Sequence, residues 1–215
     1  YSIFTMIYSF STAGLPAALA KMVAEQSVRG RARDIRKLHQ LSVKLFLILG
    51  IAGTVLILLF SRLYVNLASN EGAWLSVIAI APAVFFGCMT SAYRGYYEGM
   101  RNMSPTAVSQ VVEVVVKLLV GLALALIAVR VGEAQYAAGG TVFGQVCATQ
   151  LEANAVIQQA ASAAAILGVT ISTMAGTLYL LWKYRREGDG LSEEDLRYSP
   201  RPMRGRVLMV RLVTI

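Results

Sequence analysis

The chain has 215 residues, of which 56% are hydrophobic and 15% are charged, with a formal net charge of +8. Its mean hydropathy of +0.59 is well above that of an average soluble globular domain, which favours a membrane protein. The two cysteines, Cys88 and Cys147, form neither a disulfide framework nor a metal-site spacing. Because the sequence starts without a methionine and stops inside an apolar stretch, we expect a fragment of a longer chain.

A bilayer core of about 30 Å requires roughly 20 apolar residues of helix. Five segments meet this criterion, at approximately 1–24, 42–67, 73–94, 106–129 and 162–183. The first contains Gly14 and Pro16, so we predict a helix break there, as a kink or local unwinding. The second segment is the clearest, since no charge interrupts the run from Leu45 to Phe60.

Basic residues gather in alternate connections between these segments. Those between the first two segments, or at the ends of the segments that face this connection, are Lys21, Arg29, Arg31, Arg33, Arg36, Lys37 and Lys44. Because short cytoplasmic loops collect lysine and arginine, we expect this loop to be cytoplasmic and the chain to be multi-pass in a bacterial cytoplasmic membrane. The same rule explains the cluster at 29–37 without nucleic acid, and contact with anionic membrane lipids is the expected secondary role. His39, the only histidine, is expected to be solvated in this loop.

A second polar cluster precedes the fourth segment. Gly95 and Gly99, with Pro105, predict a tight cytoplasmic connection. The charged residues that line it, which we expect at the cytoplasmic mouth of a transport path, are Arg94, Glu98 and Arg101. The tyrosines of this stretch, expected as anchors at the membrane interface, are Tyr93, Tyr96 and Tyr97.

The fourth segment carries ionisable residues inside an apolar run, "SQVVEVVVKLLVGL". At 100° per residue, one helix face collects Thr106, Gln110, Glu113 and Lys117, followed by Gly121. A charge near the bilayer centre costs roughly 2.5–3.5 kcal/mol, so this face needs a partner or a hydrated cavity. Two interpretations stay open. Glu113 and Lys117 have the spacing of a self-neutralised structural pair, or the face is a cavity wall that meets a charged substrate or a coupling cation.

The remaining parts complete an all-α, polytopic transmembrane helix bundle. Residues 131–162 are too polar to span and are expected as an external insertion, with a short surface helix over 148–162, inside a five-helix membrane bundle at 1–186. Residues 187–206 read as a polar cytoplasmic linker, and 207–215 as the start of the next transmembrane helix. Gly168, Ser172 and Gly176 favour close helix packing. No enzyme motif appears, so we predict no catalytic residue, cofactor or metal site.

Two stretches resemble a known family: "YSIFTMIYSFSTAGLPAALAKMVAE" at 1–25 and "YRGYYEGMRNMSPTAVSQVVEVVVKLLVGL" at 93–122. They are similar to the polysaccharide-biosynthesis and stage V sporulation protein B family of bacterial flippases, in the MOP superfamily with MurJ-like lipid II flippases and the MATE exporters. The resemblance implies a two-lobed transporter that acts by alternating access, with most of the first lobe, helices two to six, in this chain. It places Gln110, Glu113 and Lys117 at a central cavity. One departure is that 1–20 lacks the cavity arginines of MurJ-type proteins.

The resemblance implies transport of a lipid-linked saccharide or cell-wall precursor, in polysaccharide, peptidoglycan or sporulation pathways. The excess of base that Arg94 and Lys117 suggest fits a phosphate-bearing substrate. The alternatives are a MATE-like cation-coupled exporter of small amphipathic compounds, in which Glu113 would hold the ion, and a non-transporting membrane scaffold.

Overall fold

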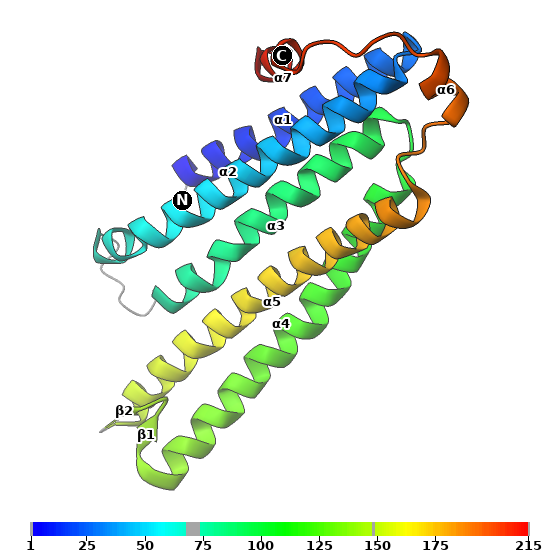
Figure 1. Ribbon diagram of the computed structural model, residues 1–215. Helices are drawn as coiled ribbons and strands as arrows, with labels where there is room; N and C mark the ends of the chain where they lie inside the picture. The colour runs from blue at the N-terminus through cyan, green and yellow to red at the C-terminus, as the bar shows by residue number, and fades with distance from the viewer. Residues whose placement is uncertain (1, 68–73, 148, 215) are drawn as a thin grey trace. The chain divides into compact units, whose positions relative to one another are not determined.

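The computed structural model describes residues 2–67, 74–147 and 149–214 of the chain. Helices make up almost all of it, which confirms the expected all-α class. The helices are α1 (Ser2–Val28), α2 (Ala32–Leu67), α3 (Trp74–Gly99), α4 (Ser104–Gly139), α5 (Gln150–Glu187), α6 (Glu193–Tyr198) and α7 (Gly205–Thr214) (Figure 1). In the described residues, four helices are long and apolar enough to cross a membrane, namely α2 to α5. Membrane crossing by α1, whose side chains are described only from Gly14, stays a prediction.

The long helices extend well beyond the apolar segments predicted for them. α4 has 36 residues, about 54 Å at 1.5 Å per residue, against a bilayer core of about 30 Å. The expected basic loop is therefore not a loop: it consists of the last turns of α1 and the first turns of α2, joined at 29–31, where Gly30 has a φ of +66°. Hydropathy measures only the apolar length, whereas Lys, Arg, Glu and Gln continue a helix readily into water.

Of the two forms of helix break predicted in the first segment, the structure excludes local unwinding, and a kink stays a prediction. α1 runs from Ser2 to Val28 with Pro16 inside it, so the local unwinding predicted at Gly14 and Pro16 is wrong. A proline removes one hydrogen bond of the helical ladder, and the bonds on either side hold the helix together.

The chain divides into two compact units. The first contains Tyr1–Gly50, Gly87–Val111 and Gly176–Ile215, and the second contains Ile51–Phe86 and Val112–Ala175. In the first unit α3 packs closely on α1: a Cβ at Gly95 would lie 2.7 Å from the Pro16 carbonyl oxygen, and one at Gly99 would lie 2.5 Å from the Val23 Cβ. Gly95 and Gly99 thus allow two helices to touch. Their predicted role in the tight connection is wrong, because that turn lies at 100–103.

Aromatic residues form a buried cluster around His39 in the first unit. This side chain is 3% exposed, and its ring centroid lies 4.3 Å from that of Tyr96 and 4.7 Å from that of Tyr184. Tyr93 and Tyr97 are also buried. The predictions of a solvated histidine and of tyrosines at the membrane interface are therefore wrong, because the helices continue past the apolar segments and pack these rings together.

In the second unit, α4 and α5 form a hairpin that ends in a small core. The strands β1 (Thr141–Val142) and β2 (Gln145–Val146) are antiparallel, with Val142 opposite Gln145, and Phe143 and Gly144 both have positive φ in the turn. Val142, Cys147 and Ile157 are buried together beneath it. The helix predicted at 148–162 is not separate: α5 begins at Gln150 and continues without interruption to Glu187. The external placement of this segment stays a prediction.

Candidate functional site

Arg94 marks the point where α3 meets the first turns of α4. Its Nε donates a hydrogen bond of 3.1 Å to the Ser109 hydroxyl oxygen, and that hydroxyl donates in turn to the Thr106 carbonyl oxygen at 2.8 Å. Ser109 is fully buried and Thr106 is 6% exposed. Part of the Arg94 guanidinium is therefore held at a fixed position against α4.

The structure divides the predicted polar face of α4 into a buried part and an open part. Thr106 lies inside the first unit, and its buried hydroxyl oxygen has no hydrogen-bond partner among the described residues. Gln110 and Lys117 are exposed, and Glu113 is half-buried. Within about three turns, the polar face therefore passes from the buried Thr106 to a part that is accessible to solvent. We call this part, which comprises Gln110, Glu113 and Lys117, the open edge of α4.

Apolar side chains flank the open edge and are themselves exposed. Val111 is 62% exposed, Val114 64% and Leu118 64%. Further along the same face, Gly121 is buried against α5: a Cβ at Gly121 would lie 3.5 Å from the Ala165 carbonyl oxygen, and the backbones of Gly121 and Gly168 touch. Close packing at Gly168 was predicted, and this contact confirms it.

The predicted cytoplasmic mouth is assembled only in part. Glu98 is half-buried near the end of α3, and Arg101 is exposed in the turn between α3 and α4. The Arg101 backbone N–H donates to the Glu98 carbonyl oxygen at 3.0 Å, and Arg101 has a φ of +58°. Arg94 is fixed by α4, whereas Arg101 is presented by the turn itself.

Sequence reasoning missed several polar residues of the first unit. Ser109 lies off the predicted polar face by its helical angle, although it is the residue that holds Arg94. The hydroxyl groups of Thr90 and Thr177 lie 2.7 Å apart between α3 and α5. Both pairs are tertiary contacts, for which a periodic pattern on one helix gives no signal. Among the described residues, no group of three or more histidines, cysteines and carboxylates is placed to hold a metal ion.

Comparison with known proteins identifies the family. The polysaccharide biosynthesis protein family matches residues 1–161, a range that includes Arg94 and the whole polar face of α4. The chain belongs to this family. It is 32% identical over 134 residues to stage V sporulation protein B of Bacillus subtilis (strain 168), covering 62% of this chain and 26% of the relative.

Lipid II flippase MurJ of the same strain is 25% identical over 140 residues, which is 61% of this chain and 26% of that protein. This chain therefore spans about a quarter of the length of both relatives. No solved structure gives a significant match.

Proposed function

We propose that this chain is part of a membrane flippase that translocates a lipid-linked oligosaccharide or a lipid II-like cell-wall precursor across the bacterial cytoplasmic membrane by alternating access. The observation that carries the proposal is the open edge of α4, where Lys117 is exposed beside apolar side chains that are also exposed. An ammonium in contact with acyl chains is costly, so this edge requires hydrated or polar surroundings. A cavity shared with the rest of the protein would supply them.

The chemistry of the cargo supports the same assignment. A pyrophosphate-linked sugar lipid has a charged headgroup that cannot cross hydrocarbon unaided, and Lys and Arg are the residues that bind phosphate oxygens. Ser109, the anchor of Arg94, and Lys117 are eight residues apart on α4, about 12 Å along the helix. Arg94 and Lys117 are thus each a candidate cation for the phosphate groups of such a headgroup.

A cation-coupled mechanism of the kind used by MATE-like exporters is the second candidate, and Glu113 is the observation that favours it. This carboxylate is half-buried on an apolar helix, where membrane-embedded acids commonly take part in ion coupling. Under this alternative, transport depends on the charge of Glu113, and an ion gradient changes the rate of export of amphipathic compounds.

The test uses the intact protein in vesicles and measures the flipping of a fluorescent pyrophosphate-linked sugar lipid. Lys117→Ala should lower the initial rate about a hundredfold, because it removes a charge-assisted phosphate contact, which is worth up to about 3 kcal/mol. Lys117→Arg should retain most of the rate. Arg130→Gln, an exposed cation on the same helix, is the matched control and should leave the rate unchanged.

Unchanged flipping by a folded Lys117→Ala protein would contradict the proposal and reduce Glu113 and Lys117 to a structural role. If Lys117→Ala still flips but Glu113→Gln abolishes the export of amphipathic cations, the exporter alternative is favoured instead.

A further inference from the structure

A hollow of about 880 Å³ lies between the first turns of α2 and the segment that follows α5. α2 contributes Arg33, Arg36 and Lys37 to its wall, and α6 contributes Glu193, Glu194 and Arg197. All of these residues belong to the first unit. Four cationic side chains therefore face two carboxylates, which leaves an excess of positive charge.

The cations of α2 are held in position, and two of them bond to neutral groups. Arg33 Nε donates to the Leu196 carbonyl oxygen at 2.9 Å, and Lys37 Nζ donates to the Met203 carbonyl oxygen at 2.6 Å. Arg36 pairs with the Asp189 carboxylate at 2.6 Å. A carbonyl group orients a cation without cancelling its charge. Arg33 and Lys37 are thus oriented but not neutralised, as expected for cations that bind an anion.

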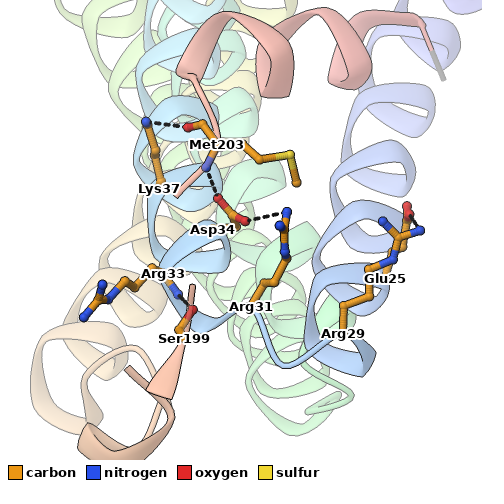
Figure 2. A network of polar contacts seen from close by, with 8 residues as sticks. All are labelled: Glu25, Arg29, Arg31, Arg33, Asp34, Lys37, Ser199 and Met203. Atoms are coloured by element: carbon orange, nitrogen blue, oxygen red, sulfur yellow. Dashed lines mark hydrogen bonds and ion pairs between the residues drawn. The ribbon is translucent and has the colours of Figure 1, made fainter. Parts of the chain in front are cut away.

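The segment 187–206 forms one wall of the hollow. It folds back onto α2, where Ser199 and Met203 lie beside Arg33, Asp34 and Lys37 (Figure 2). The Asp34 carboxylate, 1% exposed, accepts a hydrogen bond of 2.7 Å from the Met203 backbone N–H and pairs with Arg31 at 3.3 Å. The Ser199 hydroxyl oxygen accepts from the Arg33 backbone N–H at 3.2 Å and so caps α2 from a distant part of the chain. The predicted linker is therefore docked onto α2.

The hollow also lies at the polar end of an apolar helix. Lys37 precedes Leu45, where the uncharged run of α2 begins, by about 12 Å along the helix. Beyond it, Ile48 is 62% exposed, as a lipid-facing residue would be. The headgroup layer extends about 5–8 Å beyond the hydrocarbon core on each side, so a cationic hollow at this distance lies at the aqueous edge of that layer, within reach of its negative charge.

We propose that this hollow binds a phosphate-bearing anion, and that the bound anion keeps the linker docked on α2. The anion bridges cations of α2 and the Arg197 guanidinium of α6, so binding and docking are one equilibrium. The phosphate is that of an anionic lipid headgroup or of a soluble phosphate compound. The proposal concerns a site apart from the edge of α4 and is independent of what the protein transports.

The experiment follows hydrogen exchange at the Met203 amide, which is bonded to Asp34, in the intact protein. Inorganic pyrophosphate is added in detergent, and phosphatidylglycerol is added to phosphatidylcholine nanodiscs in a second arm. Slower exchange in the first arm identifies a soluble phosphate compound, and slower exchange only in the second identifies a lipid headgroup. Unchanged exchange in both arms overturns the proposal.

Two linker arginines provide a matched pair of variants. Arg197 lines the hollow, whereas Arg201 is exposed outside it, and each substitution by glutamine removes one positive charge. Arg197→Gln should raise the anion concentration for half-maximal protection about tenfold, as expected for one lost charged hydrogen bond. Arg201→Gln should leave it unchanged. Equal effects of the two substitutions would show that the anion is attracted by the overall positive charge and not bound at the hollow, and would overturn the proposal.

Asp34→Ala separates docking from simple electrostatics. Removing a carboxylate beside a cationic hollow should tighten anion binding if only net charge matters. The proposal requires the opposite, a loss of anion binding measured by calorimetry, because the linker wall is released. Tighter binding by this variant would overturn the coupling, and the two arginine variants test the site even if Asp34→Ala fails to fold.

Discussion

Around the first turns of α2, Asp34, Arg36 and Lys37 all bond to the linker, whereas on the edge of α4 Lys117 is exposed beside exposed apolar side chains. The first set of charges has its partners inside the described chain, so substitutions there should change stability and docking. Lys117, by contrast, is exposed, and under the proposed function it faces a hydrated cavity. Substitutions there should change transport while the fold persists.

The largest effect is expected where α3 touches α1. Gly99→Leu places a branched side chain where even a Cβ would lie 2.5 Å from the Val23 Cβ. Overpacking of this kind costs about 1–3 kcal/mol or more, and here the obstacle includes the backbone of α1. We expect a lower midpoint of thermal unfolding and poor yield. A Cβ added at the exposed Gly14 of α1 would meet no atom within 4 Å, so Gly14→Ala, the control, should unfold at the midpoint of the unaltered protein or slightly above it.

A smaller effect is expected at the hydrogen bond between Arg94 and Ser109, which has a structural role and a proposed role in transport. Ser109→Ala removes a buried acceptor and should cost about 1–2 kcal/mol, lowering the flipping rate as Arg94 loses one anchor. Arg94→Gln in the same assay should lower the rate further. If Ser109→Ala destabilises the protein but leaves flipping intact, Arg94 belongs with the structural charges of α2.

The smallest effect is expected in the linker. Ser199→Ala removes the hydroxyl group that caps Arg33 at the start of α2 and should cost about 1 kcal/mol. Limited proteolysis within 187–206 should accelerate about fivefold, while unfolding of the membrane helices stays the same. Ser192→Ala removes the cap of α6 alone and serves as the comparison. Equal cleavage of the unaltered and Ser199→Ala proteins would show that this contact contributes nothing to docking.

The sequence predicted the helices well and their neighbours poorly, for a physical reason. Apolar runs of membrane length identify α2 to α5 directly, and the small residue Gly168 marked a real helix contact. His39 and the surrounding tyrosines were misjudged because their burial depends on which helices meet, and the local pattern of a single helix does not reveal that. The bond between Asp34 and Met203 joins residues 169 positions apart, beyond the reach of any local pattern.

On α4 the helical periodicity located the polar face, but it did not show at which residue this face becomes exposed to solvent. Thr106 and Gln110 share that face by angle, yet only Gln110 is exposed, because α3 covers the first turns of α4. Ser109, which lies off that face by its helical angle, makes the contact with Arg94. A helical pattern gives the directions of side chains, and the position of the neighbouring helix decides which of them meet water.

The central claim is that Lys117 faces water inside the membrane, and cysteine accessibility tests it most directly. Lys117→Cys and Leu118→Cys are compared in the intact protein, in vesicles and without other reactive cysteines, using a charged thiol reagent that does not cross lipid. Leu118 is 64% exposed and points away from the polar face. The account predicts rapid labelling at 117 and at least tenfold slower labelling at 118, because a thiolate forms only in contact with water. Equally slow labelling at both positions would contradict it.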